Sequence, residues 1–247
     1  MLHEVADGIH RLTRAHVNVY LVHGDDGRVL VVDAGLPAMW ADLGHALRTL
    51  GRTPDDVAGV VLTHAHFDHL GFLARARRTL GVPAWLHPGD AHIAAHPYRY
   101  AHENARALYP VRHPAAVRVL GAMVAAGALR VPGVRDLRPL PDDGELPLPG
   151  APRVVATPGH TDGHCALHLP ERDVLLTGDA LVTLDPYTAR TGPQIVAGAA
   201  TADSAQALRS LDALAATGAT TLLPGHGEPW TAGAAAAVEQ ARAVGAH

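Results

Sequence analysis

The chain has 247 residues, of which 48% are hydrophobic, 18% charged and 4% aromatic, enough apolar sequence for one large domain with a substantial aliphatic core. Its formal net charge of −4 gives no basic excess that would draw it to nucleic acid or to an anionic membrane. All 20 basic residues are arginines, which excludes chemistry that needs a lysine, and the single cysteine excludes a disulfide, a thiolate zinc site and a protein-held iron–sulfur cluster.

The first 86 residues predict a sheet with helices packed on it. Two apolar runs flank a polar turn at 23–27, which is typical of a β-hairpin. Apolar residues then recur at helical spacing between Pro37, where a helix can begin, and Gly51, where it can end. The expected elements are strands at 17–22 and 29–32, a helix at 36–50, a strand at 57–62, a helix at 70–80 and a strand at 82–86.

Residues 87–143 differ in character from the sequence before them. They hold many of the prolines, three of the five tyrosines and a stretch of small residues at helical spacing from 114 to 129. We interpret this region as a helical insertion over the core.

Strands and helices alternate again in the last part of the chain. The expected elements are strands at 153–156, 166–169 and 174–176, a helix around 208–214, a strand at 220–223 and a final helix from Thr231. No linker rich in Gly, Ser or Pro marks a boundary, so we expect residues 1–247 to form a single α/β domain.

The sequence contains no segment typical of export or membrane insertion. Charged residues precede the first apolar stretch, and the longest apolar run elsewhere, 119–129, is shorter than the roughly 20 residues of a membrane crossing. We therefore expect a cytoplasmic protein.

Four of the expected strands run into a short tip that carries an imidazole or a carboxylate. These tips hold His64, His160, Asp179 and His226. In an α/β sheet the loops after the strands lie along one edge, where such folds bind ligands. Residues far apart in the sequence are therefore expected to meet there.

The densest of these tips is His64–His69, with four metal-ligating side chains in six residues. At an extended strand end, His64, His66 and Asp68 would point to one side, and His69 would reach a different point. With the other tips the set comprises five histidines and two aspartates. This exceeds the four ligands of a closed tetrahedral site and suffices for two ions that share a bridging carboxylate.

The ligand types narrow both the metal and the chemistry. Imidazole and carboxylate without thiolate suit Zn²⁺, and also Fe, Mn or Ni. Such ligands with open positions are typical of catalytic sites, where the pKa of a bound water falls to about 7. Two ions roughly 3.5–4 Å apart would bridge a hydroxide and polarise the oxygen of an electrophile. The pattern therefore predicts hydrolysis.

The ordered motifs resemble those of the metallo-β-lactamase-fold superfamily of metallohydrolases. The matches extend over nearly the whole chain, from about residue 17 to 228. They are Val-Val-Asp33-Ala-Gly35, His64-Ala-His66-Phe-Asp68-His69, Pro-Gly-His160-Thr-Asp-Gly-His164, Thr-Gly-Asp179 and Pro-Gly-His226-Gly. The resemblance implies an αβ/βα four-layer sandwich, in which two mixed β-sheets are flanked by helices.

The resemblance also implies a role for seven residues. His64, His66 and His160 would bind one metal, Asp68, His69 and His226 the other, and Asp179 would bridge them. Asp68 would in addition hold or accept a proton from the bridging hydroxide, which makes it the expected catalytic residue. The implied cofactors are two Zn²⁺, with Fe or Mn as alternatives.

Four other residues are candidates for the surroundings of the site. Asp33 would fix the ligand loops by hydrogen bonds, although a plain turn residue explains it equally well. Phe72 stands where many members of the superfamily have a second glycine, so the resemblance does not determine the shape of the pocket beside it. We expect His164 to form hydrogen bonds near the site and Tyr187 to lie in a loop beside the metals.

The sequence therefore predicts a dinuclear metal-dependent hydrolase of a small ester, thioester or lactone, with a metal-bridging hydroxide as nucleophile. Residues 87–143 would form much of the substrate pocket. The alternatives are a glyoxalase II-like thioesterase, a mononuclear-iron persulfide dioxygenase and a non-catalytic metal-binding protein. The expected partner is a small-molecule substrate, and neither nucleic acid nor a membrane is expected as a partner. The sequence is compatible with a homodimer.

Overall fold

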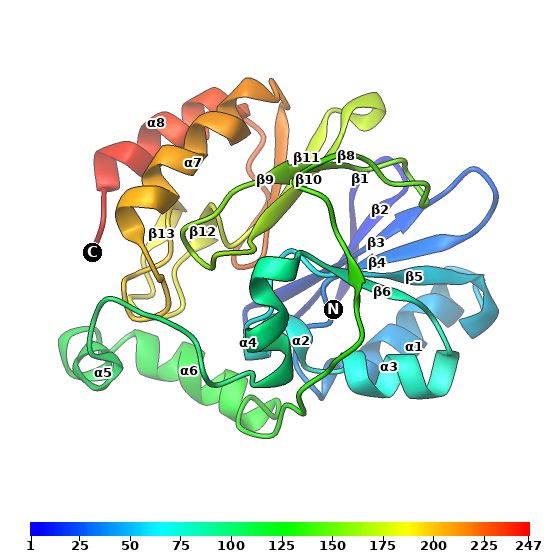
Figure 1. Cartoon of the computed structure of the whole chain (residues 1–247), viewed down its shortest axis with the longest axis horizontal. Coiled ribbons are helices and arrows are strands. Elements are labelled where there is room, and N and C mark those ends of the chain that lie inside the picture. The colour runs from blue at the N-terminus through cyan, green and yellow to red at the C-terminus, as the bar shows by residue number, and fades with distance from the viewer.

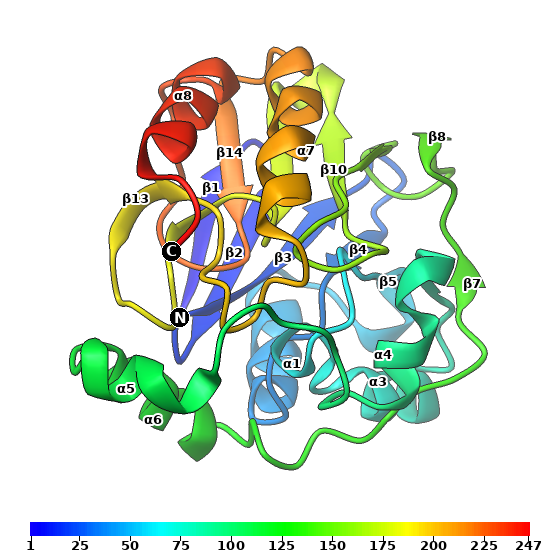
Figure 2. The ribbon, with the colours of Figure 1, turned by 60° about the vertical axis from the view of Figure 1, so that its left-hand side comes forward.

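Two β-sheets lie face to face in the computed structural model, which describes residues 1–247. Helices α7 (Ser204–Ala216) and α8 (Ala234–Val244) cover the outer face of one sheet, and α1 (Met39–Thr49) and α3 (Leu73–Leu80) cover the other. Figure 2 shows α7 and α8 in the upper part of the molecule and α1 and α3 in the lower part. The expected αβ/βα sandwich is confirmed.

The first sheet has seven strands in the order of the sequence, β1 to β7. Its first four strands pair antiparallel and its last three join in parallel, so the sheet is mixed. The strands are β1 (Leu2–Ala6), β2 (Ile9–Arg14), β3 (Val17–His23), β4 (Val29–Val32), β5 (Val57–Val61), β6 (Ala84–Leu86) and β7 (Arg138–Pro139).

The second sheet has five strands in the order β14-β11-β10-β9-β8. β11 and β14 are parallel and the other pairs are antiparallel, so β9, β11 and β14 run in the same direction and end at the same edge. The strands are β8 (Asp143–Glu145), β9 (Arg153–Ala156), β10 (Cys165–Leu169), β11 (Val174–Gly178) and β14 (Thr221–Pro224), and a separate hairpin pairs β12 (Val182–Leu184) with β13 (Thr191–Gln194).

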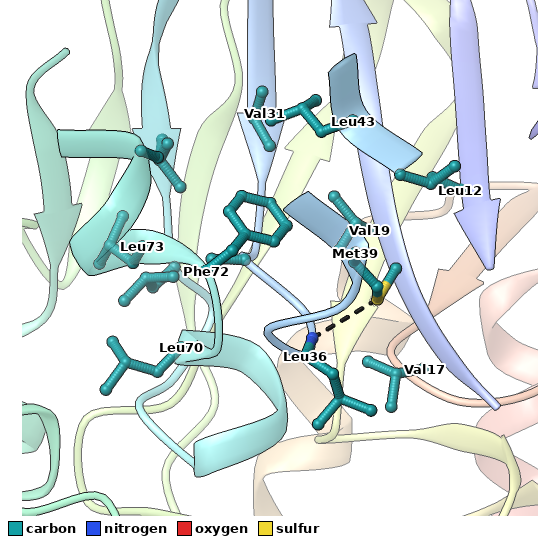
Figure 3. Close-up of a cluster of buried hydrophobic side chains, with 14 of the residues drawn as sticks. Leu12, Val17, Val19, Val31, Leu36, Met39, Leu43, Leu70, Phe72 and Leu73 are labelled. Atoms are coloured by element: carbon teal, nitrogen blue, oxygen red, sulfur yellow. Dashed lines mark hydrogen bonds between the residues drawn. The ribbon is translucent and has the colours of Figure 1, made fainter. Parts of the chain in front are cut away.

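Three apolar clusters fill the spaces between the layers. The cluster between the two sheets includes Val32 and Val61 from the first sheet and Leu167 and Leu176 from the second. The outer clusters join each sheet to its helices, and α1 contributes residues at helical spacing, among them Met39 and Leu43. Figure 3 shows these two side chains within the cluster of the first sheet. Burial of these faces explains why the predicted apolar periodicities become packed elements.

The expected helical insertion contains three short helices and also contributes to both sheets. The helices are α4 (Ala91–Ala95), α5 (Tyr109–Arg112) and α6 (Ala116–Ala125), which lie along the lower side of the molecule in Figure 1. β7 and the start of β8 fall within the same region and extend one sheet each. None of the helices of the chain is long and apolar enough to span a bilayer.

Two predictions of local structure were wrong. The expected helix at 70–80 is interrupted by Gly71 and Phe72, which separate a one-turn helix α2 (Phe67–Leu70) from α3. Gly71 lies so close to the carbonyl oxygen of Gly35 that the two backbones touch, and this approach bends the chain. Strands β1 and β2 were not predicted because histidine, arginine and glutamate interrupt their apolar alternation.

Four short 3-10 helices complete the secondary structure. They are η1 (Pro54–Asp56), η2 (Pro88–Asp90), η3 (Arg106–Leu108) and η4 (Pro170–Arg172).

Candidate metal centre

The structure brings together all seven side chains that the resemblance implies as metal ligands. They form three overlapping groups whose ligand atoms lie within 4.8 Å of one another, and every member is buried. The groups are His64 with His66 and His160, His64 with His69 and Asp179, and Asp68 with His69 and His226. Two of them match the two triads expected from the resemblance.

The side chains meet because each follows a strand that ends at the same side of the molecule. His64 and His66 lie in the loop after β5, in the first sheet. His160, Asp179 and His226 follow β9, β11 and β14, the three strands of the second sheet that run in one direction. The site therefore bridges the two sheets.

One detail of the expected geometry was wrong. His64, His66 and Asp68 do not share one side of an extended strand end, because β5 ends at Val61 and α2 begins at Phe67. The helical turn keeps the His69 ring close to that of His64, with centroids 4.2 Å apart, and places Asp68 Oδ2 3.3 Å from His226 Nε2.

Four imidazoles use Nδ1 for a hydrogen bond that points away from the centre. His69 Nδ1 donates to Asp33 Oδ2 at 2.9 Å, and His226 Nδ1 donates to the His16 carbonyl at 2.8 Å. Two further rings bond to threonine hydroxyls whose protons are already committed elsewhere, to the Asp33 carboxylate and to the Val196 carbonyl. These rings are His64 with Thr63 at 3.1 Å and His160 with Thr201 at 3.3 Å. In the neutral form of each ring, Nε2 therefore has a lone pair that faces inward.

The inward-facing atoms fit a group of metal ions. Nε2 of His64, His66 and His69 and Oδ1 of Asp179 are buried and have no hydrogen-bond partner. His66 Nδ1 and His160 Nε2 face each other at 2.9 Å. Buried polar atoms without partners are rare in proteins, and imidazole nitrogens with carboxylate oxygens are the donors that zinc, iron and manganese accept.

Asp179 lies between the two histidine triads. Its Oδ2 is 3.6 Å from His160 Nε2 and 3.3 Å from His226 Nε2, and its Oδ1 is 3.5 Å from His69 Nε2. A carboxylate with one oxygen near each triad can bridge two ions. This position agrees with the bridging role that the resemblance implies.

Burial keeps one triad neutral. Desolvation, together with the neighbouring imidazoles, holds the pKa of His64 and of His66 well below the ordinary value, and burial lowers the pKa of His160 to about 3. Neutral imidazole is the form that binds a metal, so these three rings need not lose a proton first.

The other triad is dominated by its carboxylates. Burial opposes the charging of His69, but Asp179 and Asp33 overcome it and raise its pKa to about 9. Burial would also raise the pKa of Asp179, but the neighbouring His226 and His69 hold it well below the ordinary value. Protons on these histidines would have to leave when a cation binds in their place.

Asp33 is part of the framework of the site. It is buried, and its carboxylate accepts hydrogen bonds from the Thr63 backbone N–H at 2.8 Å and from His69 Nδ1. The Asp33 backbone lies in the left-handed region, at a φ of 64°, which turns the chain beneath the ligand loop. The structure thus gives Asp33 the contacts of a residue that orients a ligand, beyond those of a plain turn.

His164 orients the loop of Asp179. Its Nε2 accepts a hydrogen bond from the Asp179 backbone N–H at 2.9 Å, and its Nδ1 bonds to the Thr157 hydroxyl at 2.7 Å. Both ring nitrogens are therefore occupied, so His164 supports the site without facing its centre.

Sequence reasoning missed Asp90, which ties two ligand loops together. This buried carboxylate accepts hydrogen bonds from the Ala65 backbone N–H at 3.0 Å, and from the Thr161 hydroxyl and the Gly163 backbone N–H at 2.8 Å each. Burial raises its pKa. An aspartate after Pro88 and Gly89 has the appearance of a turn residue, and no spacing in the sequence indicates its distant partners.

Two tyrosines close the space above the centre. Tyr100 and Tyr187 line a cavity of about 10 Å³ together with His66, Asp68, His160, Asp179 and His226. Tyr187 was expected beside the metals, whereas Tyr100 was not singled out from the other tyrosines of its region. Phe72 does not lie there: its ring is buried in the core of the first sheet beside Trp40, because the bend at Gly71 turns it inward (Figure 3).

Comparisons with known proteins place the chain in a family. A family model described as the metallo-beta-lactamase superfamily matches residues 12–226. The probable metallo-hydrolase YflN of Bacillus subtilis is 27% identical over 239 residues, which cover 92% of this chain and 87% of that protein.

Two solved structures are also similar. The metallo-beta-lactamase family protein TTHA1429 from Thermus thermophilus is 31% identical, with a TM-score of 0.68 over 96% of this chain and 79% of the other. TTHA1623, solved in a di-iron-bound form, is 27% identical, with a TM-score of 0.61 over 90% of this chain and 92% of the other.

Proposed function

The chain belongs to the metallo-beta-lactamase superfamily, and from this we propose that it is a dinuclear metal-dependent hydrolase of a small ester, thioester or lactone. The observation that carries the proposal is the convergence of five imidazoles and two carboxylates from both sheets, with unpartnered donor atoms directed at a common centre. The similarity to a probable metallo-hydrolase supports the same reaction class.

We assign the ligands as two triads joined by a bridge. His64, His66 and His160 would hold one ion, Asp68, His69 and His226 the second, and Asp179 both. Zn²⁺ suits these donors, and Fe or Mn would also fit; the di-iron form of TTHA1623 makes iron the first alternative to test. When bound, two such ions supply an activated water and polarise the carbonyl of the substrate.

The side chains around the centre would complete the reaction. Asp68 Oδ2, beside His226 and at the edge of the cavity, is placed to take the proton of the attacking water and return it to the leaving group. Burial raises the pKa of Tyr100 to about 12 and that of Tyr187 well above its ordinary value, so both phenols remain hydrogen-bond donors at neutral pH. Either hydroxyl could then stabilise a developing oxyanion.

Metal analysis combined with a substrate screen tests this proposal. Protein purified without chelators is analysed for Zn, Fe and Mn, and is then assayed with aryl esters, acyl thioesters, acyl lactones, phosphodiesters and nitrocefin. We expect two metal ions per chain and turnover of at least one acyl substrate. Turnover confined to phosphodiesters would refute the acyl-transfer assignment, and a single iron per chain would favour the persulfide dioxygenase.

A further inference from the structure

The cavity over the metal centre is too small for any substrate. Its volume is about 10 Å³, room for roughly one water molecule, whereas ligand sites usually measure roughly 300–1,000 Å³. A second cavity of about 140 Å³ adjoins it, and Tyr100 and His160 line both. Tyr100 and His160 therefore separate the two spaces. Because His160 is a proposed metal ligand, a substrate can reach the centre from this side only when the Tyr100 ring moves.

Tyr100 is held between a residue of the centre and a cation. The centroid of its ring is 3.9 Å from that of the His66 ring, and the guanidinium carbon of Arg106 lies 4.1 Å from the same ring centre. Two groups so near one ring centre cannot share one face of the ring, because they would overlap. The order is therefore His66, Tyr100 and Arg106.

Arg106 has few partners of its own. Its Nε donates to the Ala199 carbonyl at 2.9 Å, but one terminal nitrogen is buried with no acceptor, and the guanidinium forms no ion pair. By contrast, Arg11 and Arg14 pair with carboxylates. A half-buried cation with an unsatisfied hydrogen-bond donor is unfavourable unless an acceptor or an opposite charge binds it. The face of the Tyr100 ring compensates the cost of burying this charge only in part.

The surrounding segment is basic although the whole chain is acidic. Residues 91–138 contain seven arginines and only two acidic residues, whereas the chain carries a formal net charge of −4. One of these arginines, Arg99, lines the 140 Å³ cavity next to Tyr100. Such a distribution of charge attracts anions toward this side of the centre.

We propose that the substrate carries a carboxylate in addition to the scissile acyl bond, and that Arg106 binds this carboxylate when Tyr100 moves aside. Tyr100 occupies the place of the anionic group in the closed site, and the substrate exchanges a cation–π contact for a charge-assisted hydrogen bond. This inference rests on the proposed function and specifies its substrate class.

The test compares two esters that differ by one carboxylate. The loaded protein is assayed with para-nitrophenyl hydrogen glutarate and para-nitrophenyl pentanoate, and the non-enzymatic rate of each is subtracted. We expect kcat/KM for the glutarate ester to be higher by about tenfold or more, the scale of one charged hydrogen bond. Equal values for the two esters in the native protein would overturn the inference.

Variants locate this preference on Arg106. Arg106→Gln should lower kcat/KM for the glutarate ester about tenfold more than kcat/KM for the pentanoate ester, with the difference mainly in KM. Arg106→Lys should restore part of the preference. Arg118→Gln, a change on the exposed face of α6, is the matched control and should alter neither ester. A parallel loss for both esters in Arg106→Gln, or an equal effect of Arg118→Gln, would mean that the role of Arg106 is structural or that the charge effect is general.

Calorimetry gives a second readout that does not need turnover. Glutarate and pentanoate each have one carboxylate for the metal centre, and only glutarate has a second one for Arg106. We expect glutarate to bind about tenfold more tightly to the native protein and with equal affinity to pentanoate in Arg106→Gln. If neither ester is hydrolysed but this difference in binding is found, the proposed hydrolysis fails and the anion site stands. If hydrolysis occurs without the difference, the reverse holds.

Discussion

Asp33 holds the ring of His69 in place through a hydrogen bond of 2.9 Å between its carboxylate and Nδ1, which leaves Nε2 of the same ring 3.5 Å from Asp179. Asp33→Asn keeps only one acceptor oxygen, so the bond to Thr63 or the bond to His69 is lost. We expect metal affinity to fall by about 10–100-fold, the usual effect of removing a partner of a metal-ligating histidine. Competition with a chromogenic chelator measures this, with Asp26→Asn in the exposed hairpin turn as the control. Unchanged affinity would reduce Asp33 to a turn residue.

Asp68 is the residue on which the proposed proton transfer depends. Asp68→Ala should preserve the fold but lower turnover by at least about 100-fold, the lower range for loss of a positioned acid or base. The measurements are kcat with the best acyl substrate, bound metal and the circular dichroism spectrum. Asp25→Ala, in the exposed turn after β3, should be nearly silent. Turnover near that of the native protein would show that another group moves the proton.

Removal of the metals should destabilise the whole molecule, because the centre joins its two sheets. A cation that binds only the folded chain adds about 2.7 kcal/mol at a hundredfold excess over its Kd. For a chain of this size we expect Tm to rise by about 5–10 °C when the chelator-treated protein is reloaded. Differential scanning calorimetry measures the shift, and Asp179→Asn, which alters the carboxylate between the triads, should reduce it. A Tm independent of zinc, iron and manganese would contradict a metal centre at this place.

Two glycines give a matched pair for the packing of the fold. A methyl group on Gly71 would overlap the Gly35 carbonyl and the Leu36 backbone, so Gly71→Ala should destabilise by about 1–3 kcal/mol. Gly121 lies on α6 with open space where a methyl would point, so Gly121→Ala should stabilise by up to about 1 kcal/mol through helix propensity. Urea unfolding measures the free energy of unfolding of both variants. Equal free energies would show that the bend before α3 tolerates a side chain.

His247 makes stability depend on pH. Its Nε2 bonds to the buried Asp185 carboxylate at 3.0 Å, and this hydrogen bond raises the pKa of His247. A raised pKa contributes stability that is complete below the unfolded value of about 6.5 and is lost as pH rises through the folded value. His247→Gln should therefore lower the free energy of unfolding by at most about 1 kcal/mol near pH 5.5, and by less near pH 9, since the ring is partly solvated. His45→Gln, an exposed change on α1, should give no such trend. A difference that grows with pH would have the wrong sign for this ion pair.

The predicted features are those that local patterns encode. Apolar runs around a polar turn predicted β3 and β4. The four strand tips were predicted from short motifs that can be recognised from neighbouring residues alone. The fold and the family were confirmed because these motifs occur in a fixed order along most of the chain.

The missed features depend on contacts between distant residues. Asp90 differs from any turn aspartate only through its hydrogen bonds with Ala65, Thr161 and Gly163. Phe72 was misplaced because the bend at Gly71 is set by the Gly35 backbone. Tyr100 became distinct from its neighbours only through its position between His66 and Arg106. The sequence lacks local signals for all three.

Every one of the three ligand groups takes members from before residue 70 and from after residue 159. Separate fragments of the polypeptide, one ending near residue 143 and one starting near residue 151, would each carry an incomplete set. Cofactor uptake would then report reassociation of the fragments, and during folding it would follow the meeting of the two sheets. The centre would thereby report on assembly in addition to its proposed catalysis.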